Sequence, residues 1–219
     1  MKLNNYNNLL ELFFDQYEKQ DKNNIFLINL GNPKHKLSWE KTYLLVNHLS
    51  NQISKDIKLG DRCVLISENR PEWMISDLAI MLAGGISVPS YTTYTTKDYE
   101  YIIKDCEPSV LIVSNNTQFN KIKDILDYKK IKKIISFDRL ENLKFQNYLC
   151  IEDIINKKDG FENFDSEISL KRSDPACIIY TSGTQGNPKG VILSHGGILS
   201  NCEGGYELLK SIISKDMKF

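Results

Sequence analysis

The residues with the greatest capacity for chemistry lie together between Tyr180 and His195, in the sequence Y-T-S-G-T-Q-G-N-P-K-G-V-I-L-S-H. This stretch contains three glycines, several small hydroxyl or amide side chains, and one lysine, Lys189. Glycines at 183, 186 and 190 allow positive φ angles and a close approach of the backbone to a ligand. Successive backbone N–H groups in such a loop can form an anion-binding concavity, to which hydroxyl donors and a mobile ammonium group add. The composition therefore favours the binding of a polyphosphate.

The stretch differs from the common phosphate-binding loop, in which Gly-x-x-x-x-Gly-Lys-[Ser/Thr] opens a helix. Here Pro188 precedes Lys189, Gly190 follows it, and Val191–Leu193 is typical of a strand. Because Ala176–Tyr180 is also short, apolar and partly β-branched, we expect two buried strands joined by a polar loop. Hydroxyl groups and backbone amides would then bind the ligand in place of a helix N-terminus. Composition alone is equally compatible with an ordinary glycine-rich hairpin loop that binds nothing.

The order of the residues resembles the ATP phosphate loop of the AMP-forming adenylate ligases, the superfamily of acyl-CoA synthetases, peptide-synthetase adenylation domains and luciferases. The matching residues are Thr181-Ser182-Gly183-Thr184-x-Gly186-x-Pro188-Lys189-Gly190, with Tyr180 before them and Val191 and Ser194-His195 after them. Gln185 departs from the family pattern, in which threonine or another small residue is usual.

The resemblance implies an ATP site and a reaction. In this family a carboxylate attacks the α-phosphorus of ATP, pyrophosphate leaves, and the acyl-adenylate passes to CoA, with Mg²⁺ as the metal. Catalytic roles are implied for Lys189, which would neutralise charge on the leaving group, and for Thr184. We interpret His195 as capping the next helix rather than as a substrate-side residue. The nucleotide-binding residues implied are Thr181, Ser182, Gly183, Thr184, Gln185, Gly186, Pro188, Lys189 and Gly190.

The elements that must position this loop alternate between helix and strand patterns along the chain. Cys63–Ile66, a helix from Pro71 to Ala83, and Ile86–Val88 form a β-α-β unit, the repeat of a parallel sheet. Ser38 is a suitable N-cap for a helix that reaches Ile53. We expect an α/β fold with mainly parallel sheets flanked by helices. The other expected helices are 6–20, 98–105, 119–126, 151–155 and 198–213, and the other strands are 25–30, 110–113 and 131–137.

A wider resemblance, to the N-terminal part of long-chain acyl-CoA synthetases, covers residues 37–201. It is carried by Leu59–Arg62, Ser67–Trp73, and Ala83–Gly85 leading to Val88-Pro89 and Tyr91. The family's magnesium-binding glutamate, its ribose-binding aspartate and its small lysine-bearing domain are not found before Phe219. We therefore expect residues 1–219 to be the N-terminal fragment of an AMP-binding domain, with its phosphate loop at 180–190. The metal ligands stay unknown, and the isolated fragment is expected to be inactive.

Composition excludes several other classes of protein. The 28 basic and 28 acidic residues balance, without the basic excess typical of nucleic-acid binding. No run approaches the ~20 apolar residues of a membrane-spanning helix. The five cysteines are widely spaced and form no metal or disulfide pattern, so we expect free thiols and a cytoplasmic protein. Peripheral association with a membrane stays open.

The substrate implied by the resemblance is a fatty acid, with ATP and CoA as the other small-molecule partners. Alternatives remain from the sequence alone. The carboxylate could be a different acid, the chain could bind a nucleotide without catalysis, or it could be a structural fragment that folds poorly because its sheet partners are absent.

Overall fold

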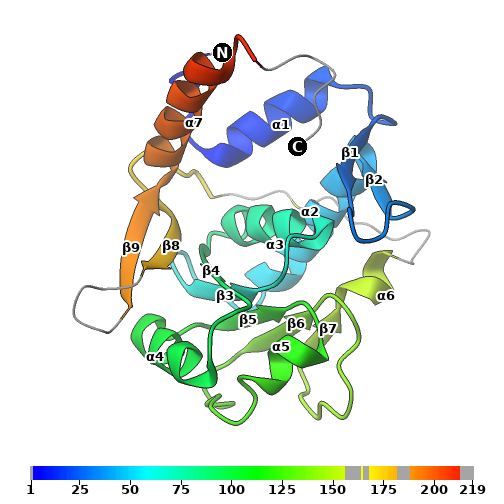
Figure 1. The fold of residues 1–219 in the computed structure, drawn as a ribbon, viewed down its shortest axis with the longest axis vertical. Helices are drawn as coiled ribbons and strands as arrows, with labels where there is room; N and C mark the ends of the chain where they lie inside the picture. The colour runs from blue at the N-terminus through cyan, green and yellow to red at the C-terminus, as the bar shows by residue number, and fades with distance from the viewer. Residues whose placement is uncertain (1, 156–163, 165–167, 182–187, 213–219) are drawn as a thin grey trace.

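The computed structural model describes residues 2–155, 164, 168–181 and 188–212. Its centre is a seven-stranded sheet with the order β7-β6-β5-β3-β4-β8-β9, in which only the β8–β9 pair is antiparallel (Figure 1). This arrangement confirms the predicted α/β class with a mainly parallel sheet. The strands are β3 (Arg62–Ile66), β4 (Ile86–Ser90), β5 (Val110–Val113), β6 (Lys133–Ser136), β7 (Tyr148–Cys150), β8 (Pro175–Thr181) and β9 (Lys189–Ser194).

Helices cover both faces of the sheet. One apolar layer joins the sheet to α1 (Leu9–Lys19), α2 (Trp39–Ser54), α3 (Pro71–Leu82) and α6 (Ile151–Ile155). The other joins it to α4 (Thr96–Cys106) and α5 (Asn116–Asn120). Successive residues of a strand point to opposite faces, so Cys63 and Leu65 pack in the first layer while Val64 and Ile66 pack in the second. Figure 1 shows α1, α2 and α3 above the sheet and α4 and α5 below it.

The chain reverses its direction across the sheet next to β3. From β3 it crosses through α3 to β4 on one side, and from β4 it crosses through α4 back to β5 on the other side of β3. Such a reversal in a parallel sheet opens a crevice beyond the carboxyl ends of the strands, where ligands of open α/β sheets bind. The fold therefore directs attention to the carboxyl edge of β3, β4 and β5.

Local signals in the sequence correctly mark several helix ends. Ser38 caps α2 by accepting a hydrogen bond from the N–H of Lys41 at 3.1 Å, and Pro71 opens α3. Gly84 follows α3 with a φ of 84°, a conformation in which a Cβ would also lie 2.5 Å from Ile168 Cδ1. These three predictions are confirmed.

Other predicted elements differ in the structure. The helix expected at 119–126 ends at Asn120, and the following residues form turns that still bury Ile122 and Leu126. The final helix, α7 (His195–Leu209), begins earlier than predicted and accommodates its glycines. Two short strands were not predicted: β7, and β2 (Lys36–Ser38), which pairs with β1 (Ile25–Ile28) in a separate two-stranded sheet.

The exit strand β9 is the clearest correction. We predicted a buried strand, but Val191, Ile192 and Leu193 are 44%, 63% and 37% exposed. The physical reason is its place at the edge of the sheet, where β8 is its only neighbour and none of the described helices covers it. Apolar β-branched residues predict a strand but do not reveal which of its faces another element covers.

None of the helices in the described part of the chain is long and apolar enough to cross a bilayer.

Candidate nucleotide-binding site

The predicted loop joins the two strands of a hairpin at the end of the sheet. Tyr180 stands opposite Gly190, and Thr181 stands opposite Lys189, so the last pair closes the hairpin at the base of the loop. Side chains directly opposite each other in an antiparallel pair lie on the same face. Thr181 and Lys189 therefore share one face, and both are exposed. Of the other predicted site residues, Pro188 is half-buried, while Ser182, Gly183, Thr184, Gln185 and Gly186 lie outside the described residues.

This hairpin lies at the carboxyl edge that the topology singles out. β8 runs parallel to β4, with Cys177 beside Ser87, and ends at Thr181. A cavity of about 610 Å³ lies beside it, and the segments that follow β3 and β4 form part of its wall. Cys177 and Ile179 line this cavity, and Thr181 shares their face because side chains alternate along a strand. The remaining polar lining comes from Ser67, Glu68, Asn69, Asp77, Ser90, Tyr91 and Thr92.

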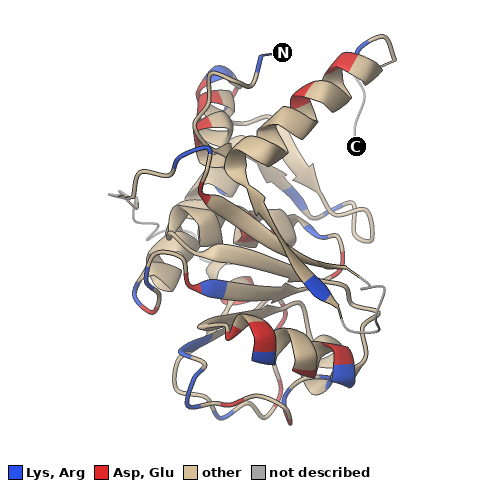
Figure 2. Ribbon diagram, turned by 90° about the vertical axis from the view of Figure 1, so that its left-hand side faces the viewer, with Lys and Arg blue, Asp and Glu red and all other residues tan. Residues whose placement is uncertain are grey.

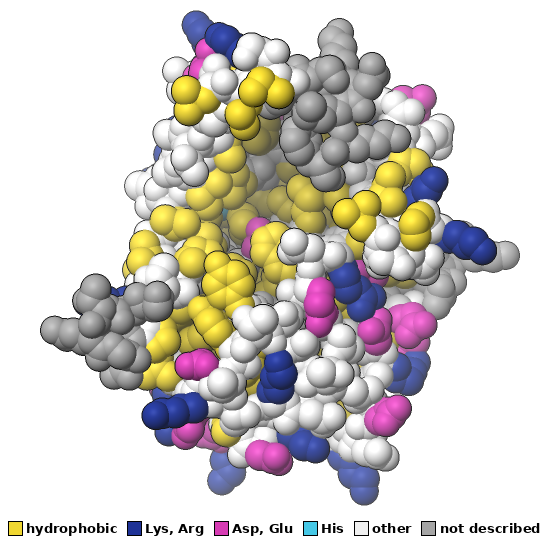
Figure 3. Space-filling model, viewed as in Figure 1, with side chains coloured by type: hydrophobic (Ala, Val, Ile, Leu, Met, Phe, Trp, Pro, Cys, Tyr) yellow, Lys and Arg dark blue, Asp and Glu magenta, His cyan; other side chains and the backbone are white. Residues whose placement is uncertain are grey.

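The cavity continues into a larger apolar hollow. A second cavity of about 660 Å³ shares five lining residues with the first, namely Leu9, Asn69, Trp73, Asp77 and Met81. Figure 3 shows this hollow, lined mainly by hydrophobic side chains, on the face viewed in Figure 1. Burial raises the pKa of Asp77 to about 6, so its carboxyl group loses its proton less readily than an exposed aspartic acid. The first cavity thus has polar groups from the segments that follow β3 and β4, and it continues into an apolar interior.

Lys189 is a cation at the end of the hairpin whose strand β8 lines the first cavity. It is the only charged residue in β8 and β9, two strands that are otherwise uncharged in Figure 2. No carboxylate in the part of the chain that the structure describes pairs with it. Arg70, which lies between β3 and α3 and lines the second cavity, is already held by both oxygens of Asp138, at 2.9 and 3.0 Å, and by Glu72 at 3.3 Å. An arginine neutralised by two carboxylates has little capacity left for a phosphate.

Gly190 does not use the positive φ that we expected of it, since Gly60 and Gly84 are the described glycines with that conformation. Glycine is needed at this position for a steric reason. A Cβ at this position would lie 3.0 Å from Ile178 Cγ2 and 3.2 Å from Tyr180 Cζ, on the neighbouring strand. The absence of a side chain therefore allows the Tyr180 ring to lie across the hairpin, close to the backbone of β9.

His195 is not the helix cap that we predicted. Ser194 caps α7 by accepting a hydrogen bond from the N–H of Gly197 at 3.1 Å, while His195 is only 1% exposed. Its Nδ1 accepts a hydrogen bond from the N–H of Leu9 at 3.4 Å. Burial lowers the pKa of His195, although the nearby charge of Asp174 acts in the opposite direction. The residue therefore joins the N-terminal segment to the start of α7.

Sequence reasoning missed the residues of α4, and of the loop before it, that hold the hairpin in place. The Tyr180 phenol donates to Asp105 Oδ2 on α4 at 2.5 Å, and the Tyr94 phenol donates to the carbonyl oxygen of Tyr180 at 3.1 Å. The run of tyrosines at 91, 94, 99 and 101 was a visible signal. Without the fold, however, nothing connected Tyr94 in that run to a strand residue 86 positions later.

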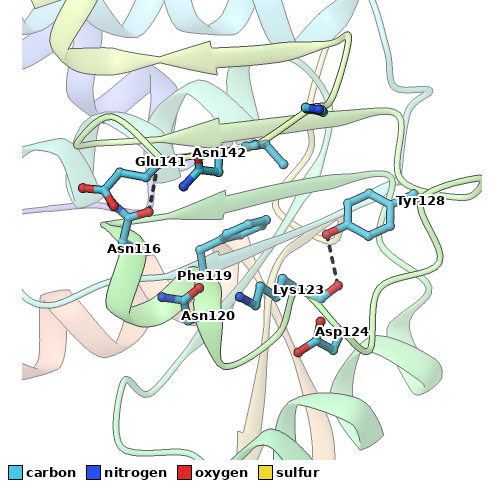
Figure 4. A pocket seen from close by; sticks show the side chains of 10 residues that line it. Asn116, Phe119, Asn120, Lys123, Asp124, Tyr128, Glu141 and Asn142 are labelled. Atoms are coloured by element: carbon cyan, nitrogen blue, oxygen red, sulfur yellow. Dashed lines mark hydrogen bonds between the residues drawn. The ribbon is translucent and has the colours of Figure 1, made fainter.

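A separate polar cavity of about 520 Å³ lies between α5 and the segment 141–144 (Figure 4). Two of its polar side chains, Asn116 and Tyr128, are hydrogen-bonded to backbone groups. Asn116 accepts from the N–H of Glu141 at 3.0 Å and donates to the carbonyl oxygen of Arg139 at 3.2 Å, and Tyr128 donates to the carbonyl oxygen of Lys123 at 3.0 Å. None of the predicted site residues lines it.

A metal site is not evident in the described residues, which bring together no group of three or more His, Cys, Asp or Glu side chains able to hold an ion. We therefore assign no residue of this chain to magnesium. The five cysteines are all free, as predicted, and Cys202 is the exposed one.

Solved structures of adenylate-forming ligases share this fold. An anthranilate-CoA ligase, AuaEII, in complex with anthranoyl-AMP superposes with a TM-score of 0.71 at 24% identity, over 89% of this chain and 36% of that chain. ATP-bound MatB from Rhodopseudomonas palustris gives the same TM-score and identity, over 94% of this chain and 38% of its own. These similarities define a class of protein by its fold.

The family follows from the sequence comparison. A family model described as AMP-binding enzyme matches residues 13–215, and the chain belongs to this family. The rat long-chain-fatty-acid–CoA ligase ACSBG1 is 31% identical over 175 residues, which are 75% of this chain and 24% of that protein. Fatty acyl-CoA synthetase A of Dictyostelium discoideum is 27% identical over 190 residues, 83% of this chain and 28% of that protein. The chain thus spans about a quarter of the length of these relatives.

Proposed function

We propose that this chain is the ATP-binding portion of an AMP-forming ligase that converts a fatty acid to its acyl-adenylate and then to acyl-CoA. The observation that carries the proposal is the pairing of Thr181 with Lys189 at the carboxyl edge of the sheet, beside a cavity with an apolar interior. Membership of the AMP-binding family and similarity to fatty-acid–CoA ligases support it. The five free thiols support the proposal that the protein functions in a reducing compartment such as the cytoplasm.

In this proposal the residues of the hairpin bind the phosphates of ATP, which enters as its magnesium complex. Thr181 supplies a hydroxyl donor, and Lys189 faces it from the opposite strand with an ammonium group that no carboxylate among the described residues pairs with. The family pattern adds Ser182, Gly183, Thr184, Gln185 and Gly186 as further phosphate contacts, with Pro188 and Gly190 shaping the loop. Charge on the leaving pyrophosphate grows as the bond to the α-phosphorus breaks. A lysine placed there stabilises the transition state more than the bound substrate.

The proposal is tested by equilibrium binding of ATP to the purified chain and to Lys189→Ala. An exposed lysine–phosphate contact is partly screened by water and salt, so we expect the variant to bind ATP about three- to tenfold more weakly. Adenosine, which lacks phosphates, should bind wild type and variant equally. The matched control is Lys36→Ala, since Lys36 is also an exposed lysine at the end of a strand, but in the separate β1–β2 sheet. Equal ATP affinity of wild type and Lys189→Ala would refute the assigned role of Lys189.

The catalytic part of the proposal has its own expectation. In an enzyme that contains this chain, Lys189→Ala should lower the single-turnover rate of adenylation by on the order of 10²-fold, while the affinity for the carboxylate changes little. Thr184→Ala should act in the same direction but less, because it removes a neutral donor. The 219-residue chain alone should bind ATP without releasing pyrophosphate when a fatty acid is added.

A further inference from the structure

The tip of the hairpin is weakly attached to the rest of the sheet. β8 pairs with β4 only at Cys177 and Ser87, and beyond that point its residues pair with β9 alone. β9 in turn is an edge strand, so Ile178–Thr181 and Lys189–Ile192 form a two-stranded ribbon. Such a ribbon is marginally stable in water unless other elements support it. Something else must fix the position of Thr181 and Lys189.

Tyr180 provides the first support. Its side chain is only 3% exposed and lies among the apolar residues that α4 packs against the sheet. Its phenol donates to Asp105 Oδ2 near the end of α4 at 2.5 Å, a charge-assisted hydrogen bond of the stronger kind. Burial and this hydrogen bond both raise the pKa of Tyr180, so the phenol keeps its proton and remains a donor throughout the physiological range.

The backbone of the same residue receives a second support. The Tyr94 phenol donates to the Tyr180 carbonyl oxygen at 3.1 Å, immediately before the chain reaches Thr181. Tyr94 belongs to the loop between β4 and α4, which is itself fixed. Tyr99 donates to the Tyr91 carbonyl oxygen at 2.7 Å, and Lys121 donates to the Thr92 carbonyl oxygen at 2.5 Å.

The ring of Tyr180 also reaches across to the second strand. It lies so close to Gly190 that a Cβ there would be 3.2 Å from Cζ and 3.4 Å from Cε1. One side chain thus contacts α4, its own strand and the strand that carries Lys189. The contacts end one residue before Thr181 on one strand and one residue after Lys189 on the other.

We propose that Tyr180 is a positioning residue for polyphosphate: held by Asp105 through its phenol and by Tyr94 through its carbonyl, it fixes the separation and direction of Thr181 and Lys189. This inference rests on the proposed ATP site and assigns to it three residues outside the phosphate contacts. Tyr180 touches no phosphate in this scheme. It acts by reducing the ordering that the hairpin must undergo when the ligand binds.

The test uses Tyr180→Phe, which keeps the ring over Gly190 and removes only the phenol oxygen, together with Asp105→Ala and Tyr94→Phe. We expect Tyr180→Phe to weaken ATP binding about fivefold, through lost preorganisation. The double variant Tyr180→Phe/Asp105→Ala should be no weaker than Tyr180→Phe, because both changes break one hydrogen bond. Tyr94→Phe should add a further, independent loss.

Matched controls separate positioning from a general loss of stability. Tyr6→Phe removes a phenol-to-aspartate hydrogen bond of the same 2.5 Å length, from Tyr6 to Asp15, at the N-terminal helix. Tyr128→Phe removes a phenol-to-carbonyl bond at the separate polar cavity. Both controls should leave the ATP affinity unchanged, even where chemical denaturation shows that they are as destabilised as Tyr180→Phe.

A second readout does not need a ligand. Amide hydrogen exchange should become faster at Ile178–Thr181 and Lys189–Ile192 in Tyr180→Phe and stay unchanged in α2 and α3. Unchanged exchange in the hairpin would overturn the inference, and so would wild-type ATP affinity in Tyr180→Phe. If the wild-type chain bound no ATP, the proposed function would fail, and the exchange result alone would still decide whether Tyr180 holds the hairpin.

Discussion

At the scale of single residues, two glycines that look alike in the sequence have opposite effects on stability. Gly190 lies under the Tyr180 ring, where a Cβ would be 3.0 Å from Ile178 and 3.2 Å from Tyr180. Gly204 lies in α7, where a Cβ would meet no atom within 4 Å. The first glycine is fixed by packing across the hairpin. The second only weakens a helix, because glycine leaves more backbone entropy to be lost on folding.

Two alanine substitutions should therefore change stability in opposite directions. We expect Gly190→Ala to lower the free energy of unfolding by about 1–3 kcal/mol, the usual range for overpacking. Gly204→Ala should raise it by about 0.5–1 kcal/mol. Urea denaturation followed by circular dichroism measures both. A Gly190→Ala protein as stable as wild type would show that the Tyr180 ring can move aside without cost, which would contradict tight packing at this position.

At the scale of elements, the start of α7 is tied to the N-terminal segment. Arg172 donates to the carbonyl oxygens of Leu3 and Tyr6, at 3.2 and 2.7 Å, and to Ser200 Oγ at 3.3 Å. His195 accepts from the Leu9 N–H at 3.4 Å beside this arginine. α7 directly follows β9, so these contacts anchor the strand that carries Lys189 at its other end.

This junction should make stability depend on pH. Burial lowers the pKa of His195 in the folded chain, so the unfolded chain binds a proton more readily. The stability contributed by the neutral imidazole is complete above the ordinary pKa of about 6.5 and is lost as the pH falls through the lowered value. His195→Asn keeps a hydrogen-bond acceptor but cannot titrate. We expect wild type to lose more unfolding free energy than this variant between pH 7.5 and pH 5, as urea titrations at both pH values will measure. Parallel losses would contradict a buried neutral histidine.

The elements also show what the sequence could and could not predict. Ser38, Pro71 and Gly84 were predicted correctly because capping and turn chemistry act over a few residues. The position of α5 was not, because Asn115 caps a helix that ends at Asn120, while the apolar spacing continues through Ile122 and Leu126 in turns. Residues in the helix and residues in the turns after it bury apolar side chains at the same spacing. The spacing of apolar residues therefore could not distinguish a helix from turns at this place.

For the site, the sequence predicted the residues of the loop and the strands on either side of it. It could not predict that β9 is an exposed edge, because exposure depends on which elements pack nearby. Nor could it predict that Asp105 and Tyr94 hold Tyr180, since those contacts join residues 75 and 86 positions apart. Motifs specify local chemistry, whereas the residues that support a motif come from the fold.

At the scale of the whole molecule, two cavities compete for the role of nucleotide site. One, of about 610 Å³, lies beside the β8–β9 hairpin, and the other, of about 520 Å³, lies between α5 and segment 141–144. The second contains Lys123 and Lys144 and has polar walls, so charge alone does not exclude it as an anion site. We propose the first cavity, because β8 lines it with Cys177 and Ile179, Thr181 follows on the same face of that strand, and Lys189 lies opposite Thr181 with no carboxylate partner among the described residues.

The measurement that tests this placement most directly is a titration of ATP into the ¹⁵N-labelled chain, followed by amide NMR. We predict saturable shift changes that are largest at Thr181, Lys189 and Gly190, with further changes at 67–69 and 91–94, and none at Asn116, Asn120 or Asn142. Saturable changes confined to the cavity between α5 and segment 141–144, or none at the hairpin, would contradict the central claim that this hairpin binds the phosphates of ATP.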